Sequence, residues 1–106
     1  MTDRDRDIAR QFKAVIERCG VPVVKLILYG SRARGDATDE SDLDLMVVLE
    51  SADPDFDEAV ERVAWQVGFD SGIVVSTVVF TRDELEKSPL RCSPFVNTVQ
   101  REGIAV

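Results

Sequence analysis

Apolar residues recur at helical spacing in two stretches of the chain, and each stretch predicts an amphipathic helix. The first covers Asp3–Arg18 and ends before Gly20. Its apolar positions share one helix face: Ile8, Phe12, Val15, Ile16 and Cys19. The second can be capped by Asp53 or Asp55, and we expect Gly68–Gly72 to end it. Its apolar positions repeat the first spacing: Phe56, Val60, Val63, Ala64 and Val67.

Three runs of apolar and β-branched residues predict strands. Residues 23–29 form a nearly continuous apolar run, which is typical of a strand covered on both faces. Residues 42–49 and 73–80 are the other two runs. After them, Thr81 and Glu84 form a capping-box pattern that opens a short helix through Lys87. Residues 95–101 predict a last helix before a short apolar tail.

The order of these elements predicts the fold class. Helix, strand, strand, helix, strand and short helices favour a small mixed β-sheet with helices packed on it, an α/β or α+β fold. The 106 residues, 44% of them hydrophobic, suit one domain with one core over residues 1–106. Because no run of about 18 apolar residues occurs and residues 1–7 lack the core of a signal peptide, we expect a cytoplasmic protein.

Composition and charge exclude several function classes. A net charge of -7 opposes attraction to nucleic-acid phosphates, so we expect no nucleic-acid partner. The chain has no histidine, which excludes Ser/His and Cys/His catalysis and His-based zinc sites. Cys19 and Cys92 are too far apart for a metal knuckle, and we interpret them as reduced thiols. Acid–base chemistry therefore falls to carboxylates.

A glycine-serine turn follows the first strand and is suited to binding phosphate. Gly30 lets the backbone approach a ligand closely, and Ser31 offers a hydroxyl and a backbone N–H at the start of one helical turn. Arg32 and Arg34 follow at once, and either can reach the same phosphates while the other is a solvated surface residue. The turn therefore predicts a phosphate-binding site.

Two carboxylates open the second strand and are suited to binding a divalent cation. Asp42 and Asp44 point to the same face, because side chains alternate along a strand. Mg²⁺ prefers oxygen ligands and is commonly held by one or two carboxylates together with substrate phosphates. The sequence therefore predicts a magnesium site beside the phosphate-binding turn.

Gly30-Ser31, ten further residues and then Asp42-x-Asp44 resemble the signature of the DNA polymerase β-like nucleotidyltransferase superfamily. The small size resembles its minimal nucleotidyltransferase (MNT) branch, and the resemblance covers most of the chain. It implies a polymerase β-like nucleotidyltransferase fold, with a nucleoside triphosphate on Gly30 and Ser31. It also implies Mg²⁺ on Asp42 and Asp44, with ATP as the nucleotide substrate.

The same resemblance implies a third carboxylate on the next strand, where it acts as base and metal ligand. Aligning the exit of that strand with the helix start at Thr81 places Ser76 at this position. Serine cannot serve as a carboxylate base and is a weaker, neutral ligand. Asp70 or Asp83 can replace it only if the strand is offset or the loop folds back.

The aromatic residues suggest core rather than ligand contacts. Phe12, Phe56, Trp65 and Phe69 are expected to belong to the core, because they lie on or near apolar helix faces. Tyr29, directly before the turn, is interpreted as an ordinary strand residue.

Three functions are compatible with these residues. The first is Mg²⁺-dependent transfer of AMP from ATP to a hydroxyl of a partner protein. By resemblance, MNT proteins often pair with a HEPN-domain protein as its antitoxin. The second is a catalytically impaired nucleotide-binding or antitoxin subunit that acts by complex formation, because Ser76 replaces the third carboxylate. The third is a scaffold whose acidic pair is only a solvated strand end. Homo-oligomerisation is left open.

Overall fold

A four-stranded mixed sheet forms the centre of the fold, as seen in a computed structural model that describes residues 1–106. The strand order is β3-β2-β1-β4, with β1 antiparallel to β2 and β4, and β2 parallel to β3. This arrangement confirms the predicted mixed sheet. The strand bounds are β1 Val23–Tyr29, β2 Leu43–Leu49, β3 Val75–Thr81 and β4 Ile104–Ala105.

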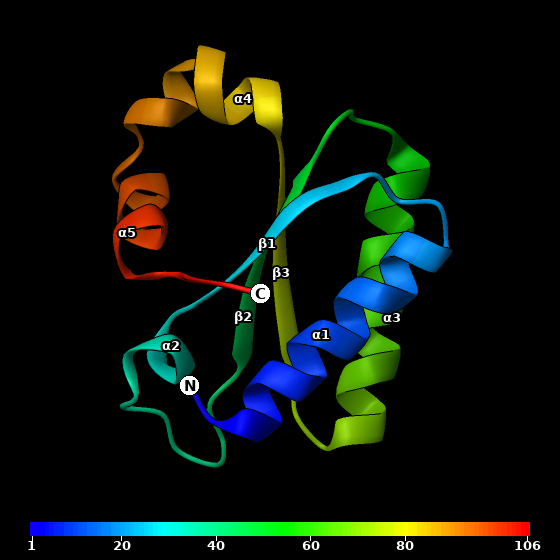
Figure 1. Ribbon diagram of the computed structural model, residues 1–106, viewed down its shortest axis with the longest axis vertical. Helices are drawn as coiled ribbons and strands as arrows, with labels where there is room; N and C mark the ends of the chain where they lie inside the picture. Colours follow the sequence, from blue (N-terminus) through cyan, green and yellow to red (C-terminus); the bar gives the residue numbers. More distant parts are fainter.

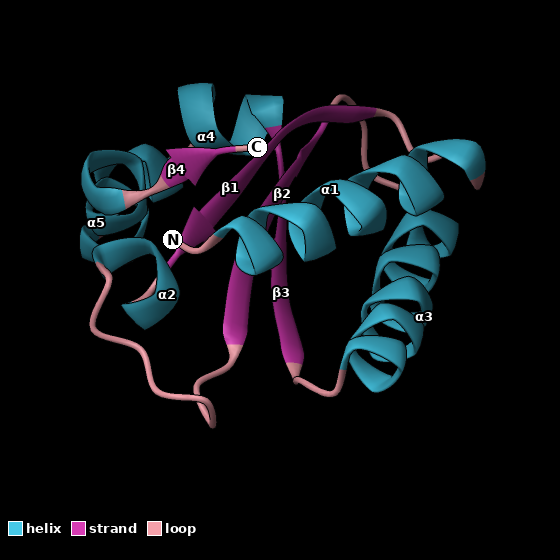
Figure 2. Cartoon of the chain, turned by 60° about the horizontal axis from the view of Figure 1, so that its bottom comes forward, coloured by secondary structure: helices cyan, strands magenta, loops and turns pink.

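Helices cover the two faces of the sheet unequally (Figures 1 and 2). The two long helices α1 and α3 pack on one face and build a cluster of 16 buried residues. The short elements α4 and α5 pack on the other face over a cluster of six. All helices are too short or too polar to cross a lipid bilayer. Their bounds are α1 Asp3–Arg18, α2 Ser31–Arg34, α3 Pro54–Ser71, α4 Arg82–Lys87, the 3-10 helix η1 Pro89–Cys92 and α5 Pro94–Glu102.

Strand alternation in β2 decides which side chains meet which helices. Leu43, Leu45, Val47 and Leu49 point to the α1/α3 face, where all are fully buried. Met46 and Val48 point to the opposite face. Asp44 shares the parity of Met46, so it lies on the sparsely covered face at the start of the strand.

The expected helices and strands are confirmed to within two residues at most ends, with three differences. Gly68 belongs to α3, which continues to Ser71 and is capped by Gly72, and not to a break. The glycine serves packing instead, since a Cβ at Gly68 would lie 2.6 Å from the carbonyl oxygen of Ile73. The apolar tail forms β4, pairing Ile104 with Leu28 of β1. The turn η1 was not expected from the sequence.

Two of the four aromatic residues expected in the core lie on the surface. Phe12 is fully buried and Phe56 packs against the large cluster, as predicted. Trp65 and Phe69 are 69% and 70% exposed and stack on each other, with ring centroids 5.4 Å apart. The prediction was wrong because α3 packs beside β3, the edge strand, where no further strand covers the outer flank of the helix.

Candidate functional site

The turn after β1 brings the backbone directly against an acidic side chain. Gly30 has φ +77° and ψ -159°, a backbone region that is essentially restricted to glycine. A Cβ at Gly30 would overlap the Oδ2 atom of Asp44. The glycine thus permits both the turn into α2 and the close approach of the Asp44 carboxylate. Ser31, the first residue of α2, is partly exposed beside it.

Asp42 and Asp44 lie close enough to influence each other. Asp42 is exposed in the loop before β2, and Asp44 is half-buried in the strand, opposite Tyr29 of β1. Burial raises the pKa of the Asp44 carboxyl, the negative charge of Asp42 raises that pKa further, and Arg34 lowers it. The two ionised carboxylates therefore repel each other, and a bound cation would reduce this repulsion.

Ser76 lies directly opposite Asp44 on the neighbouring strand. In the parallel pairing of β2 with β3, Ser76 is the register partner of Asp44, while Thr77 pairs with Leu45 on the opposite face. Its side chain therefore shares the Asp44 face of the sheet. A hydroxyl occupies the position at which the resemblance implies a carboxylate.

No third carboxylate replaces it. Asp70 is on α3, on the other face of the sheet, and accepts a hydrogen bond from Gln66. Asp83 follows β3 and forms an ion pair with Lys87. The structure contains no group of three acidic, His or Cys side chains arranged to hold a metal ion. The alternatives that depended on an offset strand are therefore not supported.

The Arg32 side chain points into the protein and not toward the predicted phosphate site. Its side chain is only 8% exposed, and its Nη1 donates to Oδ1 of the buried Asp5 at 3.0 Å. Nε and Nη2 donate to the Ser41 carbonyl at 2.9 and 2.7 Å, and Nη2 reaches the carbonyls of Thr38 and Asp39 at 3.5 Å. Arg32 therefore fixes the loop that leads into Asp42, and its donors are not free for a ligand.

Arg34 lies on the exposed side of the same helical turn. Its Nε contacts Asp36 at 3.3 Å and its Nη1 contacts Glu102 of α5 at 3.8 Å. Because these pairs are solvent-exposed, they are weak and exchangeable. Its charge also acts on Asp44. Of the two arginines, Arg34 is the one that can turn toward an anionic ligand.

An aromatic pair lies next to the acidic pair, and the sequence did not reveal it. Tyr29 packs edge-to-face on Phe95 of α5, with centroids 5.5 Å apart. Burial raises the pKa of the Tyr29 hydroxyl, and the charge of Asp44 raises it further. Phe95 and Glu102 reach the site only through the packing of α5, so no local sequence signal marks them.

A family model described as a nucleotidyltransferase domain matches residues 8–106. The chain belongs to this family. The solved structure titled "Structure of putative minimal nucleotidyltransferase" aligns with a TM-score of 0.57 and 27% identity, over 96% of this chain and 95% of that one. The nucleotidyltransferase fold expected from the sequence is thus confirmed, and the family implies a nucleotide substrate.

Two curated relatives are similar over part of their length. A Methanocaldococcus jannaschii protein named "Putative protein adenylyltransferase" is 35% identical over 65 residues, 61% of each chain. A bifunctional uridylyltransferase/uridylyl-removing enzyme of Burkholderia vietnamiensis is 38% identical over 71 residues, 62% of this chain and 8% of that enzyme. The chain thus spans less than two thirds of the length of both relatives.

The donor set of this nucleotidyltransferase-family protein fits a magnesium ion. Asp42 and Asp44 offer hard oxygen atoms, and burial, followed by the negative charge of Asp42, raises the pKa of the Asp44 carboxyl. Mg²⁺ accepts one or two carboxylates and completes its shell with water and substrate phosphates, so a missing third carboxylate does not exclude it.

We expect Asp44→Asn to raise the melting temperature in EDTA at about pH 7. Since the folded-state pKa of Asp44 is raised, its stabilising contribution is present at low pH and is lost as pH rises through that pKa. The gap between the variant and the wild type should widen from about pH 4 to about pH 7, measured by calorimetry. Asp39→Asn, which removes an exposed carboxylate of the same loop, is the control for the loss of one negative charge. A gap that does not change with pH would contradict the electrostatic explanation.

Proposed function

We propose that the chain is a Mg²⁺-dependent nucleotidyltransferase that transfers AMP from ATP to a hydroxyl of a partner protein. The observation that carries this proposal is the close approach of Gly30 to Asp44, with Asp42 beside them. It supports a site where phosphate oxygens on the turn and carboxylate oxygens on β2 face one another. The adenylyltransferase name of the Methanocaldococcus relative supports AMP as the transferred group.

In the proposed reaction, each residue has a defined task. Gly30 and Ser31 bind the triphosphate through backbone and hydroxyl groups, and Arg34 leaves Glu102 to contact a phosphate. Asp42 and Asp44 would hold Mg²⁺, which supplies charge neutralisation for the phosphates. The acceptor oxygen bonds to the α-phosphorus, the bond to pyrophosphate breaks, and pyrophosphate leaves while the hydroxyl proton passes to solvent or to a carboxylate.

The partner in this proposal is a HEPN-domain protein for which the chain acts as antitoxin. This part of the proposal rests on the resemblance of Gly30-Ser31 and Asp42-x-Asp44 to the minimal nucleotidyltransferase branch, whose members often pair with such a protein. A second function rests on Ser76: without a third carboxylate beside Asp44, the chain can bind nucleotide and restrain the partner by complex formation alone. The two functions differ in whether label moves to the partner.

Label transfer separates the two functions. The chain, Mg²⁺ and a candidate HEPN-domain partner are incubated with ATP radiolabelled at the α-phosphate or, in parallel, at the γ-phosphate. We expect only α-label on the partner, and a loss of at least about 100-fold in Asp42→Ala and Asp44→Ala, since even residues that only support metal ligands contribute 10- to 100-fold. Asp39→Ala, in the same loop, should retain transfer. A stable complex without transfer would establish the second function instead.

A further inference from the structure

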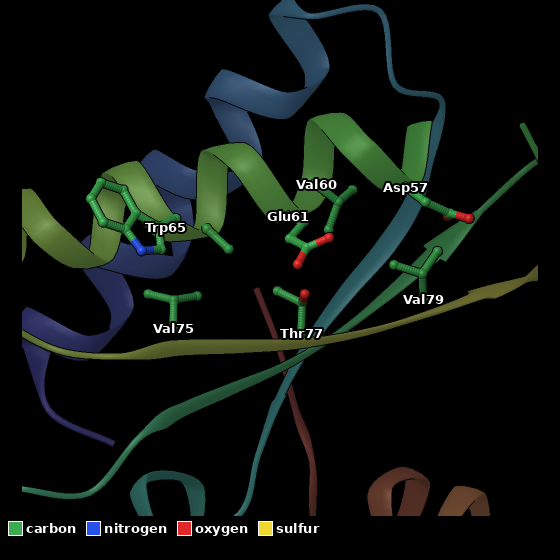
Figure 3. A pocket seen from close by; sticks show the side chains of 8 residues that line it. Asp57, Val60, Glu61, Trp65, Val75, Thr77 and Val79 are labelled. Atoms are coloured by element: carbon green, nitrogen blue, oxygen red, sulfur yellow. The ribbon is translucent and has the colours of Figure 1, made fainter. Parts of the chain in front are cut away.

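A groove runs between α3 and the edge strand β3, on the opposite face of the sheet from Asp44 (Figure 3). Val75, Thr77 and Val79 of β3 form its floor, and Asp57, Glu61 and Trp65 of α3 form its rim. The rest of the apolar face of α3 is buried against α1 and the sheet. The groove is thus a surface that the nucleotide site does not use.

The groove adjoins unpaired backbone and exposed apolar side chains. As the outer strand of the sheet, β3 presents N–H and C=O groups along one side, and all its residues are partly exposed. Trp65 and Phe69 stack on the surface at one end, and Val74 beside them is 62% exposed. A contiguous apolar patch next to an open strand edge is typical of a protein-binding surface.

Negative charge lies in the middle and at one end of the groove. Figure 3 shows Trp65 over Val75, Glu61 over Thr77, and Asp57 at the end that contains Val79. Neither acidic side chain forms an ion pair in the structure. One end of the groove is therefore apolar, and the middle and the other end carry uncompensated negative charge.

We propose that β3 accepts an extended segment of a partner protein as an additional strand. Because groove-facing side chains on a strand recur every second residue, the segment would place an apolar side chain at Trp65 and Lys or Arg at the next two groove-facing positions, beside Glu61 and Asp57. This inference rests on the sheet edge and its charges and not on nucleotidyl transfer.

Charge also distinguishes the segment from other occupants. Pairing β3 with β3 of a second copy would bring two α3 helices side by side, each with Glu61 and Asp57, in a chain of net charge -7. Nucleic acid would place phosphates against the same carboxylates. A basic, partly apolar strand is the occupant that complements the groove.

The test is a titration with the peptide acetyl-Thr-Ile-Thr-Lys-Thr-Lys-Thr-amide, followed by amide NMR and by the emission of Trp65, the one tryptophan of the chain. We expect saturable binding with shifts along Val75–Thr81, and at least about tenfold weaker binding when both lysines are replaced by glutamate. Glu61→Lys should weaken binding of the lysine peptide about tenfold. Glu58→Lys makes the same charge change on α3 outside the groove and should have less than about a twofold effect.

Three results would overturn the inference. The first is equal affinity for the lysine and glutamate peptides, and the second is no binding at millimolar peptide. The third is a dimer of the chain alone, detected by sedimentation and mapped to β3 by amide NMR. Each is independent of the label-transfer experiment, so loss of AMP transfer with peptide binding intact would remove only the proposed function.

Discussion

Arg32→Met is expected to destabilise the fold by about 3–5 kcal/mol, out of the roughly 5–15 kcal/mol that holds a domain folded. The substitution keeps an apolar stem of similar length but removes the only cation that pairs with Asp5, whose side chain is 3% exposed. The Thr2 backbone N–H, at 3.3 Å, is then the one donor left to that carboxylate. A buried carboxylate without its cation carries an uncompensated desolvation cost. Urea unfolding followed by circular dichroism measures the loss.

Two controls isolate the buried pair. Arg34→Met, two residues along the same turn, removes only exposed ion pairs and should cost less than about 1 kcal/mol. Combining Asp5→Asn with Arg32→Met removes the stranded charge, so the double variant should be more stable than the sum of the single losses predicts. If Arg32→Met and Arg34→Met cost the same, Arg32 does not have the role inferred here.

Losing Arg32 should also loosen the loop before the acidic pair. Its donors bind the carbonyl of Ser41, the residue directly before Asp42. Arg32→Lys keeps the positive charge but lacks the planar fork that reaches both Asp5 and Ser41 at once. We therefore expect Lys to recover stability only in part.

Local pattern was sufficient to predict most of the fold and the position of Ser76. The helix start at Thr81 has a capping box with Glu84, which fixes the end of β3 and hence the register of Ser76 against Asp44. Gly30, Asp42 and Asp44 could be predicted as neighbours because each directly adjoins a strand end. Signals of this kind depend on residues only a few positions apart.

Features that depend on packing between distant segments could not be predicted. Nothing near Arg32 indicates that its partner is Asp5 on α1, which reaches it only when α1 packs across the sheet. Glu102 and Phe95 join the site in the same way, through α5. Trp65 lies beside the apolar stripe of α3, and its exposure follows from the position of β3 at the sheet edge.

The register of Ser76 gives the second large expected effect. Ser76→Asp adds a carboxylate on the Asp44 face, beside a carboxyl whose pKa is already raised. Without metal the third negative charge should lower the melting temperature, and with metal it should supply a further hard oxygen ligand. We expect the affinity for Mn²⁺, a probe of magnesium sites, to rise about tenfold in electron paramagnetic resonance titrations.

Thr77→Asp is the matched control, because the adjacent residue of β3 points to the opposite face. It should leave Mn²⁺ affinity unchanged, whereas Ser76→Asp should also increase AMP transfer if the third carboxylate limits the reaction. Equal affinities for the two variants would contradict the register of the site. Ser76→Asp could instead raise the metal affinity without faster transfer. A carboxylate at the expected position would then be insufficient for catalysis, and the chain would bind nucleotide and metal but act by complex formation.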